Sequence, residues 1–119
     1  DAAGVTAAFN LNLLGRINRE LGADFVVGNF SHYAQYRPVE CAARSFLISR
    51  EKQTVHVAAL NRNFEFEQWE PIFMEISQKY TAAMISDLAA ASGFEIAVTF
   101  LDKENFYCDS LWRPTVRQT

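Results

Sequence analysis

Residues 72–80 read Ile-Phe-Met-Glu-Ile-Ser-Gln-Lys-Tyr, and this segment predicts the strand around which the fold is organised. Its apolar side chains alternate with a second set, which is typical of a β-strand with one buried face. Residues two apart on one strand face lie about 6.5–7 Å from each other. The second face therefore carries a ring, a carboxylate, a hydroxyl and an ammonium in a row, from Phe73, Glu75, Ser77 and Lys79.

An amphipathic helix is predicted over Val5–Leu21, because apolar residues recur there at three- and four-residue steps. Gly22 follows as the residue that ends the helix, since glycine readily takes the left-handed conformation found there. The predicted apolar face consists of Phe9, Leu13, Leu14, Ile17 and Leu21, and the predicted polar face of Asn10, Asn12, Arg16, Arg19 and Glu20.

Four more strands are predicted between this helix and residues 72–80, from patterns of period two. The polar pair Glu51-Lys52 is a short turn between two of them, so we expect these two strands to pair as an antiparallel hairpin. Together the strands predict an antiparallel sheet of four or five strands, from residues 31–37, 43–49, 53–60, 61–67 and 72–80.

The C-terminal third predicts an α-β-β unit. Thr81 is the expected N-cap of a helix over 82–92, and strands at 94–101 and 105–112 follow, joined by a charged turn at 102–104. The two strands leave an open edge unless another segment pairs with them. The predicted fold class is therefore α+β, an N-terminal helix plus an antiparallel sheet followed by an α-β-β unit.

Composition excludes several classes of partner. The chain has 119 residues, half of them hydrophobic, which is enough for a compact core. Its net charge of −3 comes with scattered arginines, unlike the clustered positive surface of nucleic-acid-binding proteins. No apolar run approaches the roughly 18 residues of a membrane span. We therefore expect neither a nucleic acid nor a membrane as partner.

The cysteines, histidines and glycines restrict the chemistry further. Cys41, Cys108, His32 and His56 lack the spacing of metal ligands, and we expect free thiols and a cytoplasmic location. No two of the five glycines are closer than six residues, whereas a nucleotide-type cradle needs glycines one to three apart. We expect this chain to have no cofactor-binding loop of its own. Because it begins at Asp1 rather than Met, we expect a processed chain or an excised piece.

Several segments closely resemble the histidine-specific S-adenosylmethionine-dependent methyltransferases, the L-histidine Nα-methyltransferases of ergothioneine biosynthesis and their relatives. The most specific is the run Asp-Ala-Ala-Gly-Val-Thr-Ala-Ala-Phe-Asn at 1–10. The similarity continues through Leu13-Leu14, Asn18 to Phe25, Gln53-Thr54-Val55, Met74 to Tyr80, and Ala91 to Phe94, and so spans nearly the whole chain.

The resemblance implies a longer enzyme, in which a Rossmann-like domain binds S-adenosylmethionine and a second domain covers the substrate. Residues 1–80 would be part of the substrate-binding domain, and 81–119 the closing helix and strand pair of the methyltransferase sheet. The missing N-terminal region would then be this chain's partner. The chain alone would bind no S-adenosylmethionine and be inactive.

The resemblance also implies a site. A glutamate and a serine two residues later hold the substrate imidazole in the family, and they match Glu75 and Ser77. A neutral imidazole has one N–H donor and one acceptor nitrogen, so a carboxylate and a hydroxyl can serve both. Thr6, in the matching Gly-Val-Thr block, is a further candidate for the same pocket. The methyl acceptor would be the α-amine of a small amino-acid substrate, with no catalytic residue assigned in this chain.

Two departures from the family pattern affect this interpretation. A tyrosine that the family uses on the amino-acid moiety falls upstream of Asp1. A bulky methionine that flanks the imidazole corresponds to Ser45, whose smaller side chain reshapes that wall. The expected substrate is therefore histidine or a related amino acid.

Two alternatives remain open from the sequence. One is a non-catalytic α+β ligand-binding or interaction module that retains the scaffold, which Ser45 favours. The other is a fragment that forms a homodimer through its exposed strands at 94–112. Without the resemblance, Glu75 and Ser77 would be interpreted as ordinary residues on the solvent-exposed face of a half-buried strand.

Overall fold

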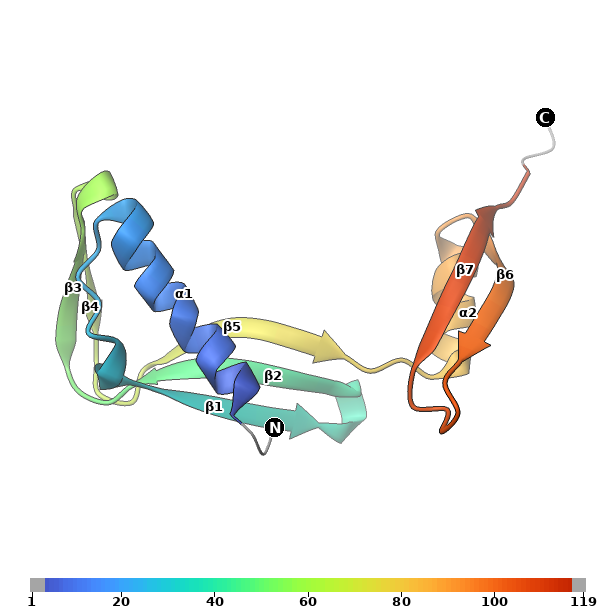
Figure 1. Ribbon diagram of the computed structural model, residues 1–119, viewed down its shortest axis with the longest axis horizontal. Coiled ribbons are helices and arrows are strands. Elements are labelled where there is room, and N and C mark those ends of the chain that lie inside the picture. The colour runs from blue at the N-terminus through green and yellow to red at the C-terminus, as the bar shows by residue number, and fades with distance from the viewer. Residues whose placement is uncertain (1–3, 117–119) are drawn as a thin grey trace. The chain divides into compact units, whose positions relative to one another are not determined.

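The computed structural model describes residues 4–116 and has the predicted α+β class (Figure 1). The chain divides between Lys79 and Tyr80 into two compact units. The first unit contains α1 (Val5–Leu21), β1 (Phe30–Arg37), β2 (Ala42–Ser49), β3 (Gln53–Val57), β4 (Arg62–Phe66) and β5 (Pro71–Gln78), with short 3₁₀ turns at Val27–Asn29, Pro38–Glu40 and Ala58–Leu60. The second unit contains α2 (Ala82–Ala91), β6 (Phe94–Leu101) and β7 (Cys108–Pro114).

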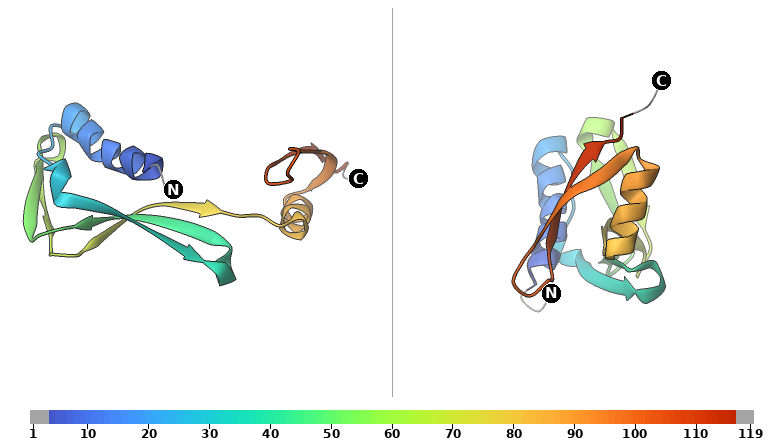
Figure 2. Two further views of the ribbon diagram at one scale, coloured as in Figure 1. Left: turned by 60° about the horizontal axis from the view of Figure 1, so that its bottom comes forward. Right: turned by 90° about the vertical axis from the view of Figure 1, so that its right-hand side faces the viewer.

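Helix α1 has the predicted bounds, and Gly22 ends it with a left-handed φ of 63°. The predicted division into faces is partly wrong. Leu14 is buried as expected, but Asn10 is buried beside it, whereas Phe9 is 69% exposed and Leu13 41% exposed. The helix, which Figure 2 shows running over the sheet, therefore turns positions 10 and 14 toward the sheet. An apolar flank with Phe9 and Leu13 stays uncovered within this unit.

Strand β2 lies at the centre of a three-stranded antiparallel sheet of order β1-β2-β5. The predicted hairpin between β2 and β3 is wrong, because both edges at the end of β2 are already occupied. Arg50 N donates to Asn29 O at 2.8 Å on one side, and Ser49 N donates to Glu70 O at 3.0 Å on the other. Strand β3 pairs with β4 instead, so the predicted sheet of four or five strands is a three-stranded sheet and a separate hairpin.

The largest differences between predicted and observed strand boundaries are at the end of β3 and the start of β7. Strand β3 ends at Val57 because a 3₁₀ turn follows it, and Asn61 closes that turn with a φ of 46°. Strand β7 begins at Cys108 because the preceding loop is longer than the predicted turn. Asp102 Oδ1 accepts a hydrogen bond from Tyr107 N at 3.0 Å, and this bond is the main cause that lowers the pKa of the Asp102 carboxyl.

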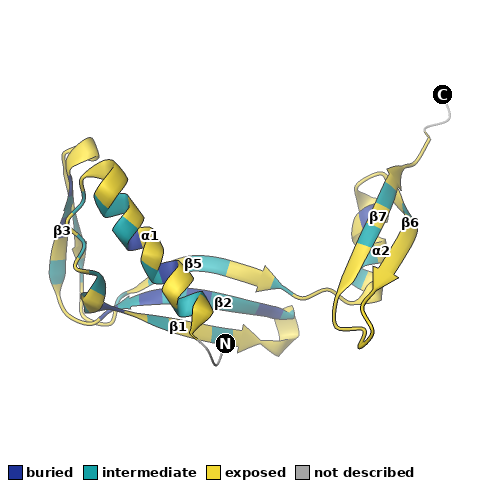
Figure 3. Ribbon diagram, in the orientation of Figure 1, coloured by how far each residue is buried: buried dark blue, intermediate teal, exposed yellow. Residues whose placement is uncertain are grey.

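The core of the first unit lies between α1 and the sheet. Leu14, Phe30 and Leu47 are each at most 3% exposed. Phe25 and Phe66 pack against Phe30 with ring centroids 5.8 and 5.6 Å away, in edge-to-face geometry. Figure 3 shows the buried positions concentrated on α1 and β2, so removal of apolar surface from water holds this helix on the central strand.

The second unit follows the predicted order. Thr81 caps α2 by accepting a hydrogen bond from Met84 N at 3.1 Å, as predicted. Strands β6 and β7 pair antiparallel, and the rings of Phe94 and Trp112 lie 5.9 Å apart. Within the described part of this unit only Ala89 is buried, and large apolar side chains of β6 such as Phe100 are more than half exposed (Figure 3). Neither helix in the described chain has the length and apolarity to cross a membrane.

Replacement of Gly22 with alanine should lower the free energy of unfolding by about 1–2 kcal/mol, because a left-handed φ strains a residue with a Cβ. The added Cβ would also lie 3.0 Å from that of Ala58. Gly28→Ala is the matched control, since Gly28 has an ordinary φ and no atom within 4 Å of its Cβ position. Urea denaturation measures both variants, and equal losses would contradict this explanation.

Candidate functional site

A β-bulge in β5 determines which side chains face α1. Ser45 is the register partner of Glu75 and Phe46 that of Phe73, so Met74 is an extra residue opposite β2. The predicted row that joined Phe73 to Glu75 is therefore wrong. Phe73 lies on the outer face, with its ring 5.7 Å from that of Phe46, while Met74 packs on the core. Glu75 is thereby on the same face of the sheet as Ser45.

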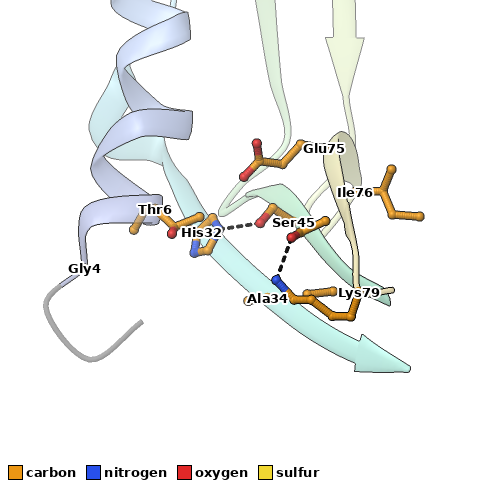
Figure 4. Close-up of a pocket in the computed structure, with 11 residues that line it drawn as sticks. Gly4, Thr6, His32, Ala34, Ser45, Glu75, Ile76 and Lys79 are labelled. Atoms are coloured by element: carbon orange, nitrogen blue, oxygen red, sulfur yellow. Dashed lines mark hydrogen bonds between the residues drawn. The ribbon is translucent and has the colours of Figure 1, made fainter. Parts of the chain in front are cut away.

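A hollow of about 610 Å³ lies between the start of α1 and this face of the sheet (Figure 4). Its volume is within the roughly 300–1,000 Å³ typical of small-molecule sites. All four predicted site residues line it, and they come from α1, β2 and β5. The lining consists of Gly4, Thr6, Ala7, His32, Ala34, Ala43, Ser45, Glu75, Ile76, Ser77 and Lys79.

Glu75 is half-buried. Asn10, which the sequence pattern assigned to the polar face of α1, lies against it. Asn10, which is 3% exposed, has its Nδ2 3.5 Å from Glu75 Oε1 and donates to Thr6 O at 3.0 Å. The sequence signal was the four-residue spacing of Thr6, Asn10 and Leu14, which places them on one helix face. Asn10 therefore connects α1 to the carboxylate of the hollow.

Ser77 is exposed at the side of the hollow, where Lys79 Nζ donates to its Oγ at 2.8 Å. An ammonium group is a donor without acceptor capacity. The Ser77 oxygen therefore accepts in this contact, and its own O–H hydrogen remains available to a ligand. The site thus offers a carboxylate acceptor at Glu75 and a hydroxyl donor two residues along the same strand.

Ser45 is only 7% exposed and lies directly across the strand pair from Glu75. Its Oγ is 3.2 Å from Nε2 of His32 on β1 (Figure 4). Sequence reasoning considered His32 only as a metal ligand. Its alternation with Ala34 on one strand face was the signal that could have placed it beside the hollow. By contrast, His56 lies on β3, hydrogen-bonded through Nδ1 to Asn63 Oδ1 at 2.7 Å.

The polar lining of the hollow therefore consists of one carboxylate (Glu75), one ammonium (Lys79), one imidazole (His32) and the hydroxyls of Thr6, Ser45 and Ser77. Such a set recognises a small polar ligand by its pattern of donors and acceptors. Within residues 4–116 no group of three His, Cys, Asp or Glu side chains is placed to hold a metal ion. Cys41 and Cys108 are free thiols, as predicted.

Comparison with known proteins matches this chain to one family over residues 1–114, described as histidine-specific methyltransferase, SAM-dependent. The chain belongs to this family. The match covers both units, including every residue that lines the hollow. The resemblance stated from the sequence is therefore confirmed.

Two curated relatives carry the name histidine N-alpha-methyltransferase. The chain is 42% identical to the one from Mycolicibacterium smegmatis over 92 residues, or 76% of its length. It is 39% identical to the one from Mycobacterium tuberculosis over 93 residues, or 78% of its length. In both cases the aligned part is 29% of the relative. The chain thus spans less than a third of the length of the curated relatives it matches.

Asn10→Asp should lower the free energy of unfolding by about 1–3 kcal/mol at neutral pH, because a second carboxylate would face Glu75 and Thr6 O would lose its side-chain donor. Asn12→Asp adds the same charge on an exposed position of α1 and should cost less than about 0.5 kcal/mol. Urea denaturation curves at neutral pH test this, and equal effects of the two variants would contradict it.

Proposed function

We propose that this chain is the C-terminal, substrate-recognising part of an S-adenosylmethionine-dependent N-methyltransferase. Its substrate is histidine or a related amino acid, methylated on the α-amine. The proposal depends on one observation: Glu75 offers an acceptor, and Ser77 an available donor, on the same face of β5. The names of the two relatives support the same substrate and reacting atom.

The two groups complement a neutral imidazole. Glu75 accepts the ring N–H, and the Ser77 hydroxyl donates to the other ring nitrogen, because Lys79 occupies its oxygen. Asn10 donates toward Glu75 Oε1 from α1 and helps to hold the carboxylate in place. A ring without these polar atoms would leave both protein groups unpaired, so the site selects against purely apolar side chains.

The contribution of this chain to catalysis is positioning. With the ring fixed at two atoms, the α-amine at the other end of the substrate takes a defined place. A neutral amine is the nucleophile in methyl transfer, and its orientation converts a bimolecular encounter into a reaction within the complex. No residue of this chain is assigned as a base.

S-adenosylmethionine supplies the methyl group in the family. The residues of this chain do not fit a site for it. The connection from β5 to α2 at residues 79–81 has no glycine. Gly22 and Gly93 adopt positive φ after helices, and Gly4 does so at the start of α1, where none of the described residues forms a preceding strand. We therefore assign the cofactor to residues outside this chain, and we expect the chain alone to be inactive.

The second unit supplies the closing helix and strand pair of the Rossmann-like methyltransferase sheet in this proposal, and residues 1–80 belong to the substrate-binding domain. The exposed apolar side chains of β6 support a role in pairing or packing with a partner segment. The missing N-terminal region is the proposed partner. Pairing of β6 with a second copy of the chain is the competing outcome, and light scattering distinguishes the two.

The family membership makes the non-catalytic module the weaker alternative. A role in ergothioneine biosynthesis belongs to the same proposal, as does a cytoplasmic location, which the two free thiols support.

Glu75→Gln in the complete enzyme should reduce kcat/KM for histidine by roughly 10- to 150-fold. This corresponds to about 1.5–3 kcal/mol, as expected when a hydrogen bond to a charged group is lost. Steady-state kinetics with saturating S-adenosylmethionine measure the effect. Glu65→Gln, on the exposed strand β4, is the control and should leave kcat/KM unchanged. Equal kcat/KM of Glu75→Gln and the wild-type enzyme would show that Glu75 does not contribute to substrate recognition.

The chain of 119 residues should show no heat of binding when titrated with S-adenosylmethionine in a calorimeter, because the proposed cofactor site lies outside it. The complete enzyme, titrated under the same conditions, is the positive control. Micromolar affinity of the isolated chain would contradict the assignment.

A further inference from the structure

The hollow contains a second pair of polar side chains, His32 and Ser45, that the proposed imidazole contacts do not involve. Glu75 and Ser77 already match the two polar atoms of a neutral imidazole. Ser45 contributes a further polar group to the same hollow, and this side chain is 7% exposed, with its Oγ 3.2 Å from Nε2 of His32. The bond to His32 offsets the free-energy cost of burying this hydroxyl, so Ser45 is an oriented polar group in the lining of the hollow.

The space beside this hydroxyl is lined by small side chains. Ala34 is the register partner of Ser45 on β1, and Ala43 lies two residues before it on the same face of β2. Ala7 faces them from the first turns of α1. Ligand atoms can therefore approach the Ser45 oxygen without displacing a large side chain (Figure 4).

The hydrogen-bonding capacity of Ser45 exceeds what the protein uses. A serine hydroxyl has one donor and two acceptor positions, and the bond to His32 uses one of the three. His32 fixes the direction of the hydroxyl and leaves the other positions for a ligand. Since Ser45 lies directly across from Glu75, a substituent on a ring held by Glu75 is placed to reach it.

We propose that His32 and Ser45 form a subsite for a neutral hydrogen-bonding substituent, such as a hydroxyl, amino or oxo group, on the ring of the amino-acid substrate. Ser45 contacts the substituent, and His32 is a positioning residue that acts through Ser45. This inference rests on the proposed function, because it requires the ring to occupy the Glu75–Ser77 pair. It narrows the substrate class to polar-substituted heteroaromatic amino acids.

Two competitive inhibitors of the complete enzyme test the subsite. 2-(Hydroxymethyl)imidazole and 2-ethylimidazole have the same number of non-hydrogen atoms and differ by one hydroxyl. The hydroxymethyl compound should inhibit more tightly by roughly 2- to 10-fold, the range of one net hydrogen bond. Ser45→Ala should bring this ratio to about one, and His32→Leu should lower it. His32→Gln should restore much of it, because the amide can bond to the same oxygen.

His56→Leu is the matched control, because His56 lies on β3 outside the hollow and should leave the ratio unchanged. A ratio of one in the wild-type enzyme would overturn the proposal without any variant, and so would an unchanged ratio in Ser45→Ala. The parent compound, imidazole, separates this outcome from failure of the proposed function. If imidazole inhibits more weakly in Glu75→Gln than in the wild-type enzyme, the proposed function stands even if the subsite is wrong. If imidazole inhibits both enzymes equally, the proposed function and the subsite are both overturned.

Discussion

The bulge at Met74 is the constraint on which the site depends. In a regular strand, Glu75 would share the outer face with Phe73, away from α1. One extra residue opposite β2 lets Ile72 and Met74 both pack on the core and still turns Glu75 inward. Core packing and the lining of the hollow thus use consecutive residues of one strand, since bulges re-aim side chains in this way.

The central position of β2 has a related consequence. Because both of its edges are paired, Ser45 has a neighbour on each side, Ala34 on β1 and Glu75 on β5. If β2 had paired only with β3, neither Ala34 nor Glu75 would lie beside Ser45. The polar groups of the hollow come from strands distant in sequence, and the sheet order brings them together.

The sequence predicted what depends on local structure. The bounds of α1, its stop at Gly22 and the cap at Thr81 follow from periodicity and terminal residues, and all three are confirmed. The partner of β2 and the bulge were not predictable, because they depend on which distant edges are occupied. Periodicity alone grouped Glu75 with Phe73, and only the resemblance to a family directed attention to Glu75, Ser77, Ser45 and Thr6, which line one hollow.

Each ligand-facing polar group of the hollow has a partner within the chain. Lys79 holds Ser77, His32 holds Ser45, and Asn10 lies against Glu75. A ligand therefore meets groups whose directions are already set, so binding costs less ordering than it would with free side chains. Fixed groups also cannot rotate to satisfy a mismatched ligand. In the proposed site, these partners limit how far the contacting groups can rotate and so contribute to selection of the substrate.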